Sequence, residues 1–346
     1  MKPRLLIKCI HGLGDNVVLT AAVRDLLHEH HGEVSVNVDS TFPDVWKNFP
    51  GLDRTITSKK CDRSYIMANV VAPESNVMPH HYMMSYHLEL MRFTGIQYRI
   101  REFGGLVIPD QGPSLMSGVC DDQPYWLLNA GVKEDIPLKG WPIDYYQDVV
   151  SSLRHEVLFV QIGSGGEGHP PLDGVIDLRG RTNVMDLIRL VHGAAGVLCG
   201  VTGLMHLAAA VPTRNGKRRA AVVIGGGREA PHWVQYPGHV YLNTCYTMDC
   251  CQDGGCWRNR PEGFNGQGPM CPRTQRMPSG QLVGECMTRF KARDVVQQVY
   301  RQAIENCSFL TGKPVIPDNM KTRNWDCGCG WYKKMWPGWH VRGVAI

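Results

Sequence analysis

Residues 175–211 read VIDLRGRTNVMDLIRLVHGAAGVLCGVTGLMHLAAAV and decide the fold class. Asn183 can cap a helix, and the apolar residues that follow have the spacing of one buried helix face: Val184, Leu187, Ile188 and Val191. Residues 196–200 form a short apolar run bounded by glycines, as expected of a buried parallel strand. The stretch therefore predicts a helix, a strand and a turn into a second helix, the repeating unit of an α/β sheet.

The turn after this strand, Val201-Thr202-Gly203, leads into a helix that begins at Leu204 and carries His206 in its first turn. Backbone N–H groups at a helix N-terminus have no partner within the helix, and together with the helix dipole they favour an anion. The turn therefore fits a phosphate group. A plain packing unit without a ligand fits the pattern equally well.

The composition limits the classes of protein. A chain of 346 residues is too long for one ordinary hydrophobic core, so we expect two domains. Its 43% hydrophobic and 20% charged residues are typical of a soluble globular protein, and its formal charge of +5 permits an anionic partner without requiring one. No apolar run approaches the roughly 18 residues of a transmembrane helix. The first residues resemble a strand more than a signal peptide, so we expect a cytoplasmic protein.

A glycine-containing loop follows the first predicted strand, residues 4–9, and precedes a helix predicted over 17–28. Gly12 and Gly14 allow a sharp turn and the close approach of a ligand, and Asp15 is left at the start of the helix. The loop has neither the Gly-Lys-Ser/Thr of a P-loop nor the third glycine of a dinucleotide fingerprint, which disfavours a Rossmann oxidoreductase. Asp15 is therefore a candidate general base, or only a helix cap.

Further strands are predicted over 125–130, 157–162 and 220–224, and each ends in a glycine-containing loop. Open α/β sheets bind ligands at this carboxyl edge of the strands. Lys139, in the segment after the first of these strands, could supply a cation there. Considered alone, it would be a surface lysine.

Two other polar clusters leave alternatives open. A basic loop precedes the strand predicted over 220–224, and we expect a solvated turn more than a contact with a polyanion; its residues are Arg214, Lys217, Arg218 and Arg219. Three histidines, for which packing or solvation is more probable than metal binding, belong to a predicted helix after Pro79: His80, His81 and His87.

Six of the thirteen cysteines fall within the Gly-, Pro- and Arg-rich segment 245–286. A loop this long, with almost no apolar periodicity, needs something other than a core to order it, and a metal held by four thiolates would do so. Zinc and iron both suit such ligands. Free or packed thiols are the alternative. The candidate ligands are Cys251, Cys256, Cys271 and Cys286, with Cys250 as a substitute.

The chain resembles the bacterial heptosyltransferase (ADP-heptose:LPS heptosyltransferase-like) family of glycosyltransferases, over most of residues 1–304. Four segments carry the likeness: GLGD at 12–15, KGWP at 139–142, DLRGRT at 177–182 and TGLMHLAAA at 202–210. The resemblance implies the GT-B architecture, an α/β fold with two Rossmann-like domains facing each other across a cleft. We therefore expect an acceptor-side domain at 1–120, a donor domain at 121–304 with a Cys-rich insert at 245–286, and a tail at 305–346.

The resemblance also implies roles for particular residues. It makes Asp15 the catalytic base and gives Lys139 a contact with donor phosphate. The nucleotide-sugar site would use the remaining residues of these motifs and a glutamate near the ribose: Gly12, Gly14, Glu167, Thr202, Gly203, Leu204 and His206. The family usually has Asp where this chain has Val201. The cysteine insert resembles a subgroup that includes metal-binding protein heptosyltransferases.

The expected function is transfer of a heptose or related sugar from a nucleotide-diphosphate sugar, with an ADP-sugar favoured, to a hydroxyl of a glycan, a protein or modified DNA. No DxD-type motif lies near these loops, so we expect catalysis without a metal ion, and zinc or iron only as a structural cofactor. Two alternatives remain open. One is a phage-type glycosyltransferase acting on modified DNA bases, which would explain the basic loop. The other is a catalytically decayed nucleotide-sugar-binding protein, which would explain Val201.

Overall fold

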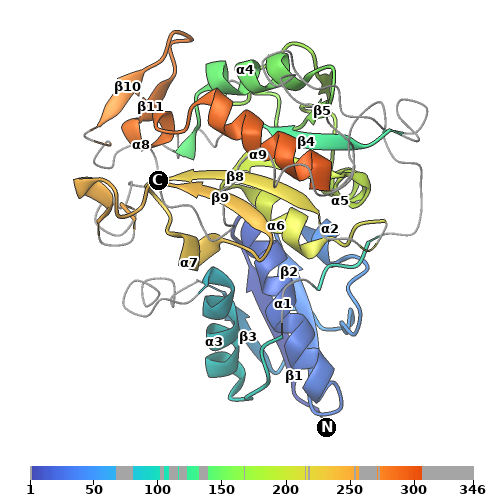
Figure 1. Ribbon diagram of the computed structural model, residues 1–346. Helices are drawn as coiled ribbons and strands as arrows, with labels where there is room; N and C mark the ends of the chain where they lie inside the picture. The colour runs from blue at the N-terminus through green and yellow to red at the C-terminus, as the bar shows by residue number, and fades with distance from the viewer. Residues whose placement is uncertain are drawn as a thin grey trace.

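A computed structural model places the chain in two parallel β-sheets, drawn one above the other in Figure 1. It describes residues 2–67, 81–101, 105–108, 116, 123–131, 139–166, 168–214, 216, 219–252, 255–256, 271 and 273–305. Everything below concerns these residues. The predicted α/β class is confirmed, because every pairing in both sheets is parallel and helices connect the strands.

The N-terminal sheet has the strand order β2-β1-β3. Its strands are β1 (Arg4–Cys9), β2 (Ser35–Ser40) and β3 (Arg63–Ile66). Its helices are α1 (Leu13–His30), α2 (Pro43–Trp46) and α3 (Tyr82–Thr94). Helix α1 begins at Leu13 rather than at residue 17 as predicted, since its backbone hydrogen bonds start directly after Gly12. Asp15 therefore lies inside the first turn of the helix.

The C-terminal sheet has the strand order β6-β5-β4-β7-β8-β9. Its strands are β4 (Tyr125–Asn129), β5 (Leu158–Gln161), β6 (Ile176–Asp177), β7 (Gly196–Gly200), β8 (Ala220–Gly226) and β9 (His239–Asn243). Its helices are α4 (Ile143–Leu153), α5 (Val184–Gly193), α6 (Gly203–Ala210), α7 (Pro231–Val234), α8 (Glu285–Thr288) and α9 (Ala292–Glu305). A 3₁₀ turn at Asp249–Cys251 and the hairpin of β10 (Thr274–Arg276) and β11 (Leu282–Gly284) complete it.

The stretch that decided the fold class forms the centre of this sheet. Asn183 caps α5 in a capping box with Asp186, and β7 is buried along its whole length. Strand β7 lies between β4 and β8. Because the three strands are parallel, the segments that follow them leave the sheet at one edge.

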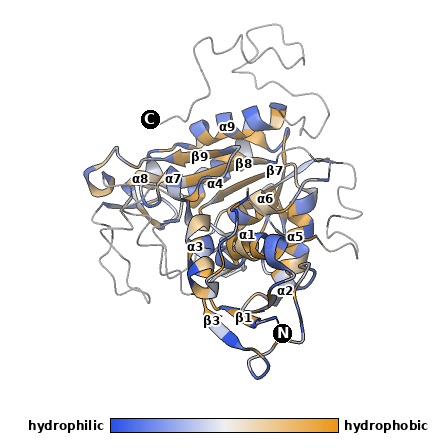
Figure 2. Ribbon diagram, turned by 90° about the horizontal axis from the view of Figure 1, so that it is seen from below, coloured by the Kyte–Doolittle hydropathy of each residue, from blue (hydrophilic) through white to orange (hydrophobic). Residues whose placement is uncertain are grey.

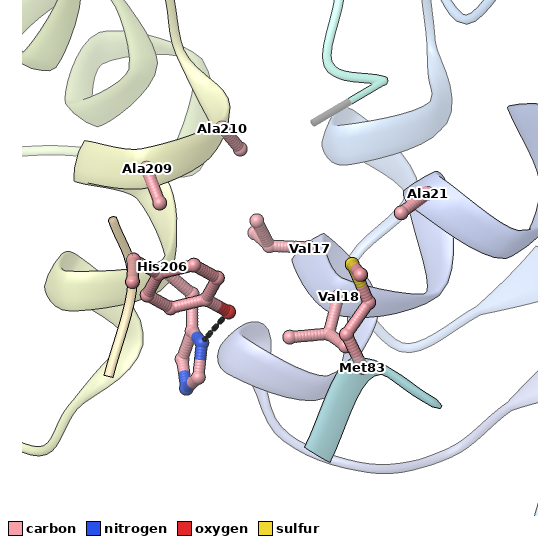
Figure 3. A pocket seen from close by; sticks show the side chains of 8 residues that line it. Val17, Val18, Ala21, Met83, His206, Ala209 and Ala210 are labelled. Atoms are coloured by element: carbon pink, nitrogen blue, oxygen red, sulfur yellow. Dashed lines mark hydrogen bonds between the residues drawn. The ribbon is translucent and has the colours of Figure 1, made fainter. Parts of the chain in front are cut away.

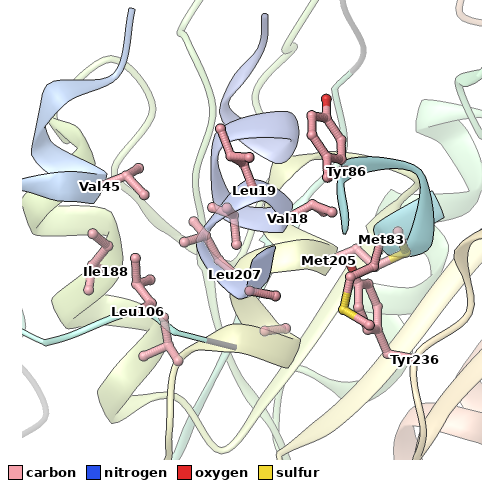
Figure 4. Close-up of a cluster of buried hydrophobic side chains, with 14 of the residues drawn as sticks. Val18, Leu19, Val45, Met83, Tyr86, Leu106, Ile188, Met205, Leu207 and Tyr236 are labelled. Carbon is pink, nitrogen blue, oxygen red and sulfur yellow. The ribbon is translucent and has the colours of Figure 1, made fainter. Parts of the chain in front are cut away.

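One apolar cluster joins the two sheets. It contains side chains of α1 and α2 together with side chains of α5 and α6, and Figure 4 shows Val18 and Leu19 near Leu207 and Met205. A second cluster covers the opposite face of the C-terminal sheet with α4 and α9, around Trp126. Figure 2 shows the matching pattern on α9, whose apolar stripe faces the sheet. The burial of α1 against α6 fixes how the loops at their N-terminal ends meet.

None of the helices in the described part of the chain combines the length and the apolar character that spanning a bilayer needs.

Candidate active site between the sheets

The loop before α1 is held by a buried asparagine that the sequence analysis missed. The side-chain amide of Asn16 donates to the carbonyl oxygens of His11, at 3.3 Å, and Gly12, at 3.1 Å. Its side-chain oxygen accepts from Ser40 Oγ, at 2.5 Å, and Trp46 Nε1, at 3.1 Å. Through Asn16, the loop before α1 is therefore held against β2 and α2.

Two tyrosines of α3 bind the Asp15 carboxylate. The Tyr86 hydroxyl donates to Asp15 Oδ1 at 2.8 Å, and the Tyr82 hydroxyl donates to the same oxygen. Burial raises the pKa of both phenols well above the usual value, so both remain protonated donors. The Asp15 carboxylate adds to the shift of Tyr82, and Tyr82 and then Asp15 add to that of Tyr86. The other oxygen, Oδ2, lies 3.3 Å from the position that a Cβ would take at Gly12. This leaves Asp15 as a half-buried carboxylate whose orientation is set from one side.

The predicted donor turn lies directly against this loop. A Cβ at Gly14 would lie 2.7 Å from His206 Cδ2, and a Cβ at Gly203 would lie 3.3 Å from the Leu13 side chain. The structure thus brings together the two glycine-containing turns, which are almost two hundred residues apart in the sequence. Both glycines permit an approach that a side chain would prevent.

His206 occupies a buried position beside Asp15. Its Nδ1 lies 2.6 Å from the Tyr236 hydroxyl, and burial lowers the pKa of its imidazole to about 3, although the Asp15 charge opposes the shift. The ring is therefore neutral at physiological pH and can exchange hydrogen bonds without carrying charge. Figure 3 shows His206 and the residues of α1 and α3 on opposite sides of a small pocket. The pocket is small, and most of the side chains that line it are apolar.

The N-terminus of α6 has the features expected of an anion site. Thr202 is its N-cap residue, but the side chain makes no capping hydrogen bond. The buried Thr202 hydroxyl has no strong hydrogen-bond partner among the described residues and contacts the Cys199 thiol. Val201, where the resembling family usually has Asp, is 9% exposed and packs in the apolar cluster. The first turn of α6 therefore keeps backbone donors available.

Lys139 lies at the same edge and is not a free surface lysine. Its Nζ lies 2.5 Å from Glu229 Oε1, in an ion pair whose side chains are 23% and 6% exposed. Its charge is also felt by His206, and its carbonyl oxygen lies 3.5 Å from the position of a Cβ at Gly200, the last residue of β7. The sequence analysis missed Glu229. The signal available in the sequence was that Glu229 closely follows the strand predicted over 220–224 and the three glycines after that strand.

The DLRGRT segment is built into the scaffold. Arg179 donates to both carboxylate oxygens of Asp177, at 2.9 and 2.8 Å, and its hydrogen bonds to Asp177 lower the pKa of that carboxyl group. Gly180 has a φ of 66° and packs against Gly165, so this turn needs glycine. Glu167, the candidate ribose contact, lies outside the described residues, as do His80 and residues 306–346 of the tail.

The expectation of a solvated basic loop is wrong for Arg219. This side chain is buried, and its guanidinium donates to the carbonyl oxygens of Ala208 and Val211, both at 2.8 Å. Burial lowers the pKa of Arg219 to about 10. Its positive charge lies at the C-terminal end of α6, where the helix dipole favours a cation. The two predicted packed histidines that the structure describes, His81 and His87, are buried or half-buried, and burial lowers the pKa of each to about 4.

The cysteines of the 245–286 insert gather near two glycines. The Sγ atoms of Cys286 and Cys271 lie 3.3 and 3.9 Å from the position of a Cβ at Gly284, and Cys251 Sγ lies 3.2 Å from that position at Gly227. Burial raises the pKa of the Cys250, Cys256 and Cys286 thiols, that of Cys256 to about 12. Neighbouring cysteines of the insert raise these pKa values further, which shows that the thiols lie close to one another. Within the described ranges, however, no group of three or more His, Cys, Asp or Glu side chains is arranged to hold a metal ion.

Comparison with known proteins points to one family. Residues 113–215 match the model of Glycosyltransferase family 9 (heptosyltransferase). No curated protein sequence gives a significant match. The likeness to solved structures extends over most of the chain, at identities that establish the fold and not the substrate.

Three of these structures illustrate the likeness. The iron-containing heptosyltransferase TibC of enterotoxigenic E. coli H10407 is 17% identical, with 88% of this chain and 77% of that chain covered and a TM-score of 0.61. The ADP-heptose LPS heptosyltransferase II of E. coli is 14% identical, with 88% and 99% covered and a TM-score of 0.58. The E. coli heptosyltransferase WaaC with ADP is 13% identical, with 88% and 99% covered and a TM-score of 0.52. The predicted GT-B fold and the family resemblance are confirmed.

Proposed function

We propose that this chain is a glycosyltransferase of the heptosyltransferase type, which moves a heptose or related sugar from a nucleotide-diphosphate sugar to an acceptor hydroxyl. The observation that carries the proposal is the contact of Gly14 with His206. Through it, a carboxylate at the start of α1 faces the anion-favouring start of α6. A base and a leaving-group site are thus side by side, as glycosyl transfer requires.

Asp15 acts as the general base in this proposal. It accepts the proton of the acceptor hydroxyl as that oxygen attacks the anomeric carbon of the donor, and the bond from this carbon to the diphosphate breaks. The phenols of Tyr82 and Tyr86 donate to Oδ1 and support the orientation of the carboxylate, so that Oδ2 is the oxygen that receives the proton. The two tyrosines are positioning residues.

The diphosphate gains negative charge as it leaves, and the donor side of the site would stabilise it. The Lys139 ammonium and the backbone N–H groups at the start of α6, beside the Thr202 hydroxyl, point to this role. Gly12, Gly203 and Leu204 shape the same turns. Because fixed donors supply the positive potential, we propose that transfer does not depend on added Mg²⁺.

The donor that we propose is an ADP-heptose or a related ADP-sugar. TibC was solved in complex with ADP-D-beta-D-heptose, and WaaC was solved with ADP. The acceptor is a hydroxyl of a glycan or a protein. Modified DNA is less well supported, because Arg219 of the basic loop is buried in the scaffold and cannot reach a phosphate backbone.

Replacement of Asp15 by Asn tests the proposal. Asn has the same shape and cannot accept the proton, so transfer from ADP-heptose should fall to background while binding of ADP-heptose stays close to that of the wild type. Asp39→Asn is the control. It replaces an exposed carboxylate of β2 by a carboxamide and should retain full activity. Full turnover by the Asp15→Asn protein would refute the role of the base. Rates that require added Mg²⁺ would refute metal-independent catalysis.

We also propose that Cys251, Cys256, Cys271 and Cys286, with Cys250 as a substitute, hold a structural zinc or iron ion that orders the insert. Thiolates suit both metals, and the Sγ atoms of Cys271 and Cys286 both lie near Gly284, with Cys251 Sγ near Gly227. TibC is iron-containing. The ion would contribute order and no chemical step.

Elemental analysis of the purified protein tests this site. About one zinc or iron per chain is expected, and the ratio should fall in Cys286→Ser but not in Cys61→Ser, a thiol outside the insert. Protein that is folded and active without either metal would contradict the proposal. Boundaries at 120 and 304 for the two domains belong to the same proposal. So does a reducing cytoplasmic location, which suits a chain of thirteen cysteines whose nine described members are all free thiols.

A further inference from the structure

The ion pair of Lys139 and Glu229 joins the ends of two strands of the C-terminal sheet. Lys139 belongs to the segment after β4, and Glu229 follows β8. Strand β7, which ends in the donor turn, lies between them. The parallel order of these three strands therefore brings both side chains to the edge where α6 begins, although they are far apart in the sequence.

The two members of the pair are buried unequally. The Glu229 side chain is 6% exposed, whereas that of Lys139 is 23% exposed. Glu229 Oε2 is buried and has no hydrogen-bond partner among the described residues, and Arg228 Nε is 3.9 Å from Oε1. The Lys139 ammonium, at 2.5 Å, is thus the closest cation to this carboxylate in the described part of the chain. The carboxylate lies behind the lysine, and the ammonium is the member that a ligand can reach.

A buried ion pair of this kind is a poor source of stability, because removing two charges from water offsets most of their attraction. It is a good device for fixing a flexible side chain. Lysine has four rotatable methylenes, and its ammonium has three N–H donors. A carboxylate that takes one donor fixes the ammonium in place and leaves two donors for oxygen atoms of a ligand.

We propose that Glu229 is the positioning residue for Lys139, fixing its ammonium for the diphosphate of the nucleotide sugar. The inference rests on the proposed function, because it requires Lys139 to bind the diphosphate. Val201 is apolar, so the turn before α6 provides no carboxylate of its own for this purpose. The carboxylate comes instead from the next strand of the sheet.

Glu229→Gln tests the inference in the full-length protein. The amide retains the size of the side chain and loses the charge, so the ammonium is held less firmly. ADP should bind roughly tenfold more weakly, and kcat with ADP-heptose should fall by a similar factor, while KM for the acceptor is unchanged. Glu229→Asp retains the charge on a shorter side chain, so its ADP affinity and kcat should lie between those of the wild type and those of Glu229→Gln. Glu156→Gln is the matched control, because Glu156 is also a buried carboxylate and lies in the turn after the C-terminal end of α4.

A double-mutant cycle separates positioning from a structural role. If Glu229 acts through Lys139, then adding Glu229→Gln to Lys139→Met should change ADP affinity and kcat/KM by less than about threefold relative to Lys139→Met alone. Independent, multiplying effects would overturn the inference, and so would ADP binding by Glu229→Gln that equals wild type. If Glu229→Gln does not fold, the same cycle is run with Glu229→Asp.

The failure of the proposed function has a different signature. A wild-type protein that binds neither ADP nor ADP-heptose would overturn the proposed function and this inference together. If Lys139→Met and Asp15→Asn each impair the enzyme as expected while Glu229→Gln behaves as wild type, the inference alone is overturned.

Discussion

Gly14 and His206 are in contact across the two sheets: a Cβ on residue 14 would lie 2.7 Å from His206 Cδ2 and 3.2 Å from its Nε2. The His206 ring cannot easily move away, because it is buried and its Nδ1 lies 2.6 Å from the Tyr236 hydroxyl. The distance between Asp15 and the turn before α6 therefore depends on the absence of a side chain at residue 14.

Gly14→Ala should separate these two turns. The added methyl group must displace either the start of α1 or the His206 ring, and a shift of about 1 Å at a catalytic carboxylate lowers kcat/KM by roughly 10–100-fold. Steady-state kinetics with ADP-heptose measure the effect. Gly32→Ala is the control, since nothing lies within 4 Å of a Cβ at that position. Activity close to wild type in Gly14→Ala would mean that the contact does not set the geometry of the site.

Tyr86→Phe should impair catalysis through Asp15. The hydroxyl donates to the carboxylate at 2.8 Å, and its loss removes one of the two hydrogen bonds that orient Asp15 Oδ1. We expect kcat to fall by roughly 10-fold while the KM for ADP-heptose stays close to that of the wild type. Tyr98→Phe is the matched control, because that buried phenol donates to the His87 carbonyl oxygen and not to Asp15. A kcat for Tyr86→Phe equal to that of Tyr98→Phe would contradict the positioning role of Tyr86.

Arg219→Met should destabilise the fold without changing substrate affinity. The guanidinium donates to the carbonyl oxygens of Ala208 and Val211, both at 2.8 Å, and methionine would leave these buried acceptors unpaired. The free energy of unfolding should fall by about 2–4 kcal/mol in urea denaturation. Arg214→Ala, an exposed change in the same loop, should have almost no effect. Equal stability of the two variants would contradict the buried role.

The buried histidines should make the protein less stable in mild acid. Burial lowers the pKa of His206 to about 3 and the pKa of His81 and His87 to about 4, whereas a solvent-exposed histidine of the unfolded chain has a pKa of 6.5. Between pH 6.5 and 4 the unfolded chain therefore binds more protons than the folded one, and the free energy of unfolding decreases as the pH falls. Each group contributes up to about 1.4 kcal/mol per pH unit within this window.

Urea denaturation at pH 7, 6 and 5 measures this dependence. His87→Gln removes one of these groups, so the free energy of unfolding should depend less steeply on pH, by up to about 1.4 kcal/mol per pH unit. His28→Gln changes an exposed histidine of α1 and serves as the control. Equal unfolding free energies at pH 7 and pH 5 would contradict the expectation.

Features that depend on neighbours in the sequence were open to prediction. The periodicity after Asn183, the helix cap at Asn183 and the glycine-bounded strand β7 follow from residues within a few positions of one another, and the structure confirms all three. The four family segments are also continuous in the sequence. Local rules and a family resemblance therefore sufficed for the α/β class, the GT-B fold and the two turns that meet at the site.

Contacts between distant segments were decided by the tertiary structure alone. Tyr86 reaches Asp15 only because α3 packs beside α1, and Glu229 reaches Lys139 only because β7 lies between β4 and β8. Arg219 is buried because the end of α6 offers unpaired carbonyl oxygens, which no property of a basic loop reveals. Hydrogen bonds and ion pairs act over about 3 Å, so their partners are set by strand order and helix packing, and the sequence by itself determines only which residues are available to form them.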